Sequence, residues 1–194
     1  MFRMDPDMLR AFRGLILPHV QDVKGWIPHG IGKLAKNITL GDSAADALRI
    51  HVWAPWLACI GPAQGAIHNH NHDFKSLVVA GEVDDQEFHV EEGSGWTLWE
   101  HRTAEGTVPV KDVHVRPGKT QRHRAGQIYR ASADRFHHSS PVDVAVTLLW
   151  RWPADTPSYA VARAVHHVVD GLTRHASAKD IERALGAADV LLRD

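Results

Sequence analysis

The chain of 194 residues carries a formal net charge of −1 at pH 7, is 44% hydrophobic and contains one cysteine. This length and hydrophobic content indicate one globular domain rather than a disordered chain. The charge balance gives no basic surplus for nucleic acid, and no apolar run approaches the ~20 residues of a membrane-spanning helix. The first residues lack the apolar core of a signal peptide, and Cys59 alone forms no internal disulfide. We therefore expect a cytoplasmic protein that binds neither nucleic acid nor a membrane.

The chain opens with an expected helix. Asp5 is a good N-cap, and Pro6 is tolerated at the first helical position. Apolar residues recur on one face of this helix through about Leu17, and Pro18 ends the pattern. Glycines and prolines interrupt the sequence that follows, where we expect loops and a short helix around Ile31–Lys36.

Short runs rich in β-forming residues then recur along the chain, separated by glycine, proline and acidic breaks. Such a pattern predicts an all-β barrel or sandwich. The polar stretches Arg102–Pro109 and Lys119–Arg124 are expected to be exposed loops. The runs are Leu48–Trp53, Trp56–Ile60, Ala66–Asn71, Lys75–Ala80, Gln86–Glu91, Trp96–His101, Asp112–Val115, Gln127–Ala131 and Val144–Trp152.

Helical patterns return near the end of the chain. An apolar stripe from Tyr159 to Leu172 predicts one helix, and Ser177 is the expected N-cap of a last helix over residues 178–192. The stripe has to be buried, either on the chain's own barrel or across a two-fold axis with a second copy. We expect a homodimer.

Three histidines occur at every second position in the middle of the chain. On a β-strand His68, His70 and His72 would all point to one side. Two imidazoles spaced in this way can reach one divalent ion at about 2.0–2.1 Å. The alternative is a solvated polar strand in a chain that has 15 histidines. We interpret the pattern as a metal site.

The stretch from Gly65 to Gly81 resembles the first metal motif of the cupin superfamily, which has His-x-His between two glycines. The resemblance implies the ligands His68 and His70. An often acidic position of the motif falls on or beside Phe74, which cannot ligate a metal. A site of three histidines without a carboxylate is similar to that of the cysteine-dioxygenase-like cupins.

The later stretch from Gly126 to Pro141 resembles the second cupin motif and implies the third ligand. His137 occupies the place of the family ligand, and His138 would point the opposite way on an extended backbone. The resemblance favours iron(II) as the cofactor. Imidazole ligands also suit zinc, nickel and copper, and manganese stays a candidate.

The resemblance covers residues 48–152 and implies a cupin fold, a double-stranded β-helix or jelly-roll barrel with helices at both ends of the chain. We expect one structural domain in three parts. These are an N-terminal helix and irregular segment (residues 1–47), the cupin barrel (48–153) and the C-terminal helices (154–194).

Five further residues are candidates for the site. His72 is a fourth ligand, a proton shuttle or a rim residue, and Tyr129 is a hydrogen-bonding acid or an aromatic of the barrel wall. Each of the strand arginines Arg49, Arg130 and Arg151 either clamps a substrate carboxylate or faces solvent.

The resemblance implies a non-haem iron(II) dioxygenase that joins dioxygen to a small thiol or amino-acid-like substrate. One alternative is a lyase, isomerase or hydrolase that uses zinc, nickel or manganese as a Lewis acid at the same site. The other is a cupin that binds a ligand without catalysis. Fold alone does not choose among them.

Overall fold

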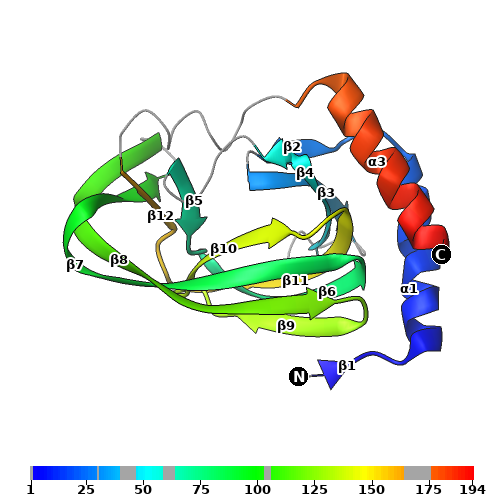
Figure 1. The fold of residues 1–194 in the computed structure, drawn as a ribbon, viewed down its shortest axis with the longest axis horizontal. Helices are drawn as coiled ribbons and strands as arrows, with labels where there is room; N and C mark the ends of the chain where they lie inside the picture. The colour runs from blue at the N-terminus through cyan, green and yellow to red at the C-terminus, as the bar shows by residue number, and fades with distance from the viewer. Residues whose placement is uncertain (1, 30, 40–46, 59–63, 103–105, 164–175) are drawn as a thin grey trace.

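The computed structural model describes residues 2–29, 31–39, 47–58, 64–102, 106–163 and 176–194. Within them, two antiparallel β-sheets face each other, and two helices lie at one end of the view in Figure 1. The seven-stranded sheet has the order β1 (Phe2–Arg3), β9 (Gln127–Ala131), β6 (His72–Ala80), β11 (Ala145–Pro153), β4 (Ala47–Ala58), β3 (Ile31–Thr39) and β2 (Ile27–His29). The five-stranded sheet has the order β10 (Phe136–Pro141), β5 (Gln64–His68), β12 (Tyr159–Ala162), β7 (Glu82–Arg102) and β8 (Gly106–Arg124).

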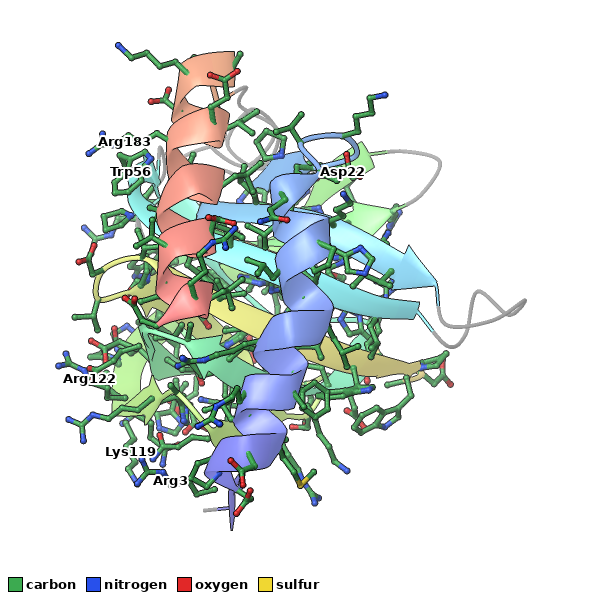
Figure 2. All side chains as sticks on the ribbon, turned by 90° about the vertical axis from the view of Figure 1, so that its right-hand side faces the viewer. Arg3, Asp22, Trp56, Lys119, Arg122 and Arg183 are labelled. Carbon is green, nitrogen blue, oxygen red and sulfur yellow. The ribbon has the colours of Figure 1, made fainter. Side chains whose placement is uncertain are left out.

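The helices α1 (Pro6–Gln21) and α3 (Ala178–Arg193) cover the outer face of the seven-stranded sheet (Figure 2). Alternate strand residues such as Ile50 and Val52 on β4 join the helices in the main apolar core, because side chains alternate between the faces of a strand. Arg183 of α3 lies over the ring of Trp56 on β4, 3.9 Å from its centroid. Both helices therefore pack on the chain's own barrel.

The expected helix ends are close to those of the structure. The Asp5 side chain accepts from two backbone N–H groups at the start of α1, and the Ser177 side chain caps α3. Helix α1 runs past the expected end at Leu17, with Pro18 inside it. The reason is that the carbonyl of Pro18 accepts from the Asp22 N–H at 3.1 Å, so the last turn closes after the proline.

The short helix expected at Ile31–Lys36 is wrong. These residues begin β3, which pairs with β2 and β4. Leu34 is fully buried opposite Val52, so pairing to neighbouring strands outweighs the local preference of a segment rich in breakers.

Several predicted strands are parts of longer ones. The runs Leu48–Trp53 and Trp56–Ile60 merge in β4 as far as it is described, and Gln86–Glu91 and Trp96–His101 merge in β7. The expected loops also fall largely within strands, since Lys119–Arg124 belongs to β8. Their polarity reflects an exposed sheet face and not a loop.

The C-terminal stripe starts as a strand and not as a helix. Tyr159–Ala162 is β12, which inserts between β5 and β7. The rest of the stripe lies outside the described residues, so the homodimer stays a prediction. Cys59 also lies outside them.

Gly81 makes the turn that the sequence predicts between two strands. Its φ of +75° lies in the left-handed region, and a Cβ there would collide with the carbonyl oxygen of Val144. The two antiparallel sheets and the terminal helices form a cupin-type jelly roll, which confirms the predicted fold class. Among the described residues, no helix combines the length and the apolar character that crossing a membrane requires.

Candidate metal centre

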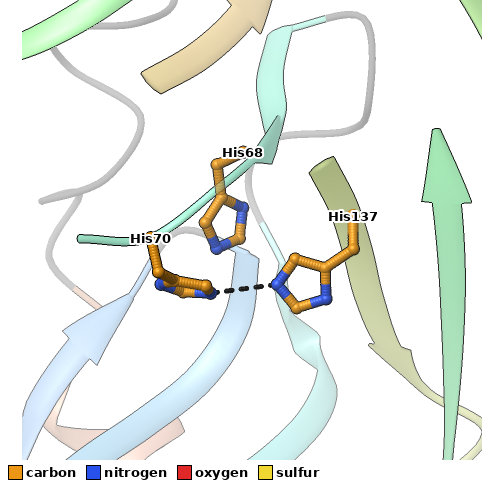
Figure 3. A group of neighbouring side chains, drawn as sticks. All are labelled: His68, His70 and His137. Carbon is orange, nitrogen blue, oxygen red and sulfur yellow. Dashed lines mark hydrogen bonds between the residues drawn. The ribbon is translucent and has the colours of Figure 1, made fainter. Parts of the chain in front are cut away.

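Strand pairing brings two of the predicted ligands together. His68 on β5 lies directly opposite His137 on β10 in the antiparallel register. His70 follows β5, and its backbone N–H donates to the carbonyl of Ala133 at 3.1 Å, which ties this segment to the turn before β10. The ligand atoms of the three histidines lie within 4.8 Å of one another, and Figure 3 shows the rings converging.

The ring nitrogens have the spacing of ligands to a single ion. The Nε2 atoms of His70 and His137 are 3.0 Å apart. Two nitrogens bound at about 2.0–2.1 Å lie roughly 3 Å apart when they subtend a right angle at the ion. The Nδ1 of His68 lies 2.9 Å from the Ala66 carbonyl oxygen and donates to it, which leaves Nε2 as the free acceptor. The donor set therefore fits one divalent ion.

A buried carboxylate stands behind the third histidine. Asp85 on β7 is fully buried, and its Oδ1 accepts from His137 Nδ1 at 2.7 Å and from Ser139 Oγ at 2.8 Å. Its Oδ2 accepts from Arg135 at 2.6 Å. A carboxylate in this place fixes the ring orientation and directs the Nε2 lone pair of His137 at the metal position.

Charge and hydrogen bonding keep Asp85 ionised. Burial alone would raise its pKa, but the hydrogen bonds from His137 and Ser139 and the charge of Arg135 hold the pKa below its usual range. Asp85 is not among the residues predicted from the sequence, because the acidic run Asp84–Asp85 does not show which of its side chains turns towards His137. On a strand Asp85 shares a face with the apolar Val83, and this spacing is the sequence signal that could have found it.

The electrostatics of the cluster favour metal binding. Burial lowers the pKa of His68 and of His70 well below the ordinary value, and the neighbouring histidines add to the effect. Both rings are therefore neutral near pH 7, and the neutral imidazole is the form that ligates a metal.

The acidic position of the motif carries no ligand. The ring of Phe74 stands against the cluster, with its centroid 5.2 Å from that of His70 and 5.8 Å from that of His137. The Asp73 carboxylate accepts from the Ala133 N–H at 2.7 Å instead. Among the described residues, the group that could hold a metal consists of histidines only.

The three histidines face a cavity of about 190 Å³ between the sheets. Of the other predicted site residues, Arg49, His72 and Tyr129 line it. Arg130 and Arg151 are absent from the lining, and Arg130 is exposed because it follows the inward-facing Tyr129 on β9. Arg130 therefore does not face the metal cluster.

His72 and Tyr129 occupy different parts of the cavity. The His72 ring centroid is 4.8 Å from that of His70, but its Nδ1 lies 2.9 Å from the Asn71 side-chain oxygen, outside the ligand group. Tyr129 is buried and stacks on His123 with ring centroids 4.1 Å apart. Burial raises the pKa of Tyr129, so its phenol is a hydrogen-bond donor at neutral pH.

His138 lies on the other face of β10, as the strand parity predicts. It is half-buried, and the cavity lining and the ligand group include His137 and not His138. The roles of all these residues in metal and substrate binding stay predictions.

No protein-family model and no curated protein matches this sequence. Among solved structures, the chain is similar to the Drosophila melanogaster CENP-C cupin domain, with a TM-score of 0.35 and 15% identity over 61% of this chain and 68% of that one. It is similar to KdgF from Halomonas sp. with a TM-score of 0.33 and 16% identity over 64% and 83% of the two chains. A structure of the DMSP lyases RdDddP and RnDddQII gives a TM-score of 0.35 and 13% identity over 63% of this chain.

The match spans only 47% of the DMSP lyase chain. These likenesses are remote, so the description of the fold rests on the chain's own sheets. The two sheets form a jelly roll of the cupin type, and the cluster of His68, His70 and His137 inside it could hold a metal ion.

Proposed function

We propose that the protein is a mononuclear metal-dependent cupin enzyme, and specifically a non-haem iron(II) dioxygenase for a small thiol or amino-acid-like substrate. One observation carries the proposal: the imidazoles of His68, His70 and His137 converge on a cavity, and no carboxylate belongs to this group among the described residues. A bound iron(II) ion would supply the redox chemistry and the open coordination positions for substrate and dioxygen.

The residues of the chain would support this reaction in separate ways. Asp85 holds the His137 ring in place, and the packed side chains of Phe74 and Leu149 exclude water from one side of the cavity. The phenol of Tyr129 stays protonated at neutral pH, because burial raises its pKa, and it can donate a hydrogen bond to a bound ligand. The guanidinium group of Arg49 reaches the cavity and is suited to an anion.

Elemental analysis and oxygen uptake test this proposal together. The purified protein is assayed for metals, loaded anaerobically with iron(II), and then mixed with cysteine, cysteamine or 3-mercaptopropionate in an oxygen electrode. We expect about one iron per chain and uptake that one of the thiols stimulates, with His70→Ala as the inactive control. Iron binding without oxygen uptake on any thiol would reject the proposed dioxygenase.

One observation favours a second function, a lyase, isomerase or hydrolase in which the metal acts as a Lewis acid. Burial, followed by the charge of Arg49, lowers the pKa of the cavity residue Lys33 to about 7, so this side chain can give or take a proton at neutral pH. Zinc in the purified protein, with activity that does not depend on oxygen, would support this function. A cytoplasmic location and a homodimer remain part of the proposal.

A further inference from the structure

One of the three histidines of the metal centre lies outside the strands. β5 ends at His68 and β6 begins at His72, so His70 belongs to the connection between them. His68 is held by strand pairing on both sides, opposite His137 and opposite Ala160. The backbone of His70 has no such ladder in the structure. We call residues 69–71 the ligand connection, and the place of His70 depends on what holds it.

A second connection runs beside the ligand connection. Residues 154–158 lead from β11 to β12, and thus from the seven-stranded sheet to the five-stranded sheet. At one end the Ala154 N–H donates to the Asn71 carbonyl at 3.2 Å. At the other end the His101 N–H of β7 donates to the Ser158 carbonyl at 2.9 Å. We call residues 154–158 the strap, which is tied to both the ligand connection and β7.

Asn69 bonds to the strap and the start of β12 through all of its polar groups. Its side-chain oxygen accepts from the Tyr159 N–H at 2.5 Å, and its side-chain NH₂ donates to the Pro157 carbonyl at 3.2 Å. Its backbone N–H donates to the Tyr159 carbonyl at 3.0 Å, and its own carbonyl accepts from the Ser158 hydroxyl at 3.5 Å. The residue is 2% exposed. Asparagine suits this position because its short side chain carries both an acceptor and a donor.

Small displacements of the ligand connection matter at the metal position. The Nε2 atoms of His70 and His137 are 3.0 Å apart, which is the spacing of two ligands to one ion. Metal–ligand distances vary by only about 0.2 Å, so His70 binds the ion only while its backbone stays in place. The His70 N–H itself donates to the Ala133 carbonyl at 3.1 Å. Most other hydrogen bonds of the ligand connection run from Asn69.

We propose that Asn69 is a positioning residue of the metal centre, which holds His70 at the ion by fixing the ligand connection to the strap. The inference rests on the metal site of the proposed function. Asn69 acts through His70 and does not touch the ion. Loss of its side chain removes the partners of the Tyr159 N–H and the Pro157 carbonyl. The His70 ring then takes several positions, so the metal binds less tightly and in a less uniform geometry.

Cobalt(II) is the probe for this role, because its visible absorption bands report the arrangement of the ligands. Affinity is measured on the purified chain by competition with a chromogenic chelator. We expect Asn69→Ala to weaken cobalt(II) binding by about 10–100-fold and to broaden the bands. Asn71→Ala is the matched control, since Asn71 lies on the same connection but is exposed, and its side chain contacts His72. We expect this control to keep the affinity and the spectrum of the wild type.

A second variant approaches the same contact from the strap. Pro157→Gly gives the strap more conformational freedom and keeps the carbonyl that Asn69 contacts. We expect weaker cobalt(II) binding, by a smaller factor than in Asn69→Ala. In the double variant the loss should equal that of Asn69→Ala alone, because the strap acts on the metal centre through Asn69. Urea unfolding of the metal-free proteins identifies the temperature at which every variant is folded, and binding is measured there.

Three results would overturn the positioning role: equal cobalt(II) affinities in Asn69→Ala and Asn71→Ala, a loss of stability in Asn69→Ala with unchanged affinity and spectrum, or additive effects of Asn69→Ala and Pro157→Gly. The second result would mean that Asn69 stabilises the fold only. A wild type that binds no cobalt(II) would reject the metal centre and this role together. The expected variant effects without iron-dependent oxygen uptake would leave the role of Asn69 in place and reject only the dioxygenase.

Discussion

The two walls of the cavity place polar side chains in different surroundings. On the five-stranded sheet, the Nδ1 of His137 is held by Asp85, and Asp85 is in turn held by Ser139 and Arg135. On the seven-stranded sheet, His51 has a buried nitrogen without a partner and Lys33 faces the cavity without a counter-ion among the described residues.

This difference separates a preformed site from an incomplete one. A hydrogen-bonded network fixes side chains before any ligand arrives. The wall that carries His68, His70 and His137, which we call the histidine wall, is therefore arranged for an ion that needs defined geometry. A buried polar group without a partner raises the free energy of the folded protein until a ligand supplies the missing hydrogen bond. The side chains of Lys33 and His51 are therefore less firmly held than the histidines of the metal cluster, and the two walls respond differently to substitution.

The largest effect is expected from removing a ligand at the histidine wall. His70→Ala leaves two imidazoles, and we expect the metal content to fall from about one ion per chain to near zero after dialysis. His138→Ala on the opposite face of β10 should keep its metal. Elemental analysis of the two variants checks the comparison, and equal metal loss in both would contradict the assigned ligand group.

The support behind the histidine wall comes next. Asp85→Ala leaves the largely buried Arg135 without its partner, and we expect the free energy of unfolding to fall by about 3–5 kcal/mol. The milder Asp85→Asn should weaken metal affinity by about 10–100-fold. The neighbouring Asp84→Asn removes an exposed pair with Arg122 and is the control, with a loss of about 0–1 kcal/mol. Urea unfolding measures these differences; similar losses in Asp85→Ala and Asp84→Asn would argue against a supporting role for Asp85.

Acid should lower the free energy of unfolding of the metal-free protein, through histidines on both walls of the cavity. Burial lowers the pKa of His68 and His70 on one wall and of His51 on the other, whereas an unfolded histidine titrates near 6.5. Below about pH 6.5 the unfolded chain binds protons that the folded cavity excludes. Each such histidine then lowers the free energy of unfolding by up to about 1.4 kcal/mol per pH unit.

Urea titrations at pH 7.5, 6.5 and 5.5 measure this slope. His51→Gln should flatten it, whereas His89→Gln, at an exposed position on β7, should leave it unchanged. A stability that stays constant down to pH 5.5 would show that the cavity histidines accept protons in the folded state.

The smallest effect is expected at the rim between the walls. His72 contacts the His70 ring but lies outside the ligand group, so His72→Ala should lower metal affinity much less than His70→Ala. Metal competition with a chromogenic chelator distinguishes the two variants. If His72→Ala releases the metal and His68→Ala retains it, the ligands are His70 and His72 instead.

The sequence by itself determined the barrel, the two outer helices and the group of histidines. Short β-rich runs predict strands through local periodicity, and Asp5 and Ser177 mark the helix starts through local capping. The spacing of His68, His70 and His72 is also a local feature. The choice of His68, His70 and His137 as ligands came from the resemblance to the two cupin motifs.

Only the tertiary structure decided which residues face one another across the cavity. Asp85 meets His137 because β7 pairs with β10, and Lys33 joins Arg49 because β3 is a strand and not a helix. Such contacts depend on register between strands that are distant in sequence, and a shift of one residue would turn each of these side chains to the other face. Periodicity along a single strand carries no information on that register, so the support behind His137 and the place of Lys33 beside Arg49 emerged only from the fold.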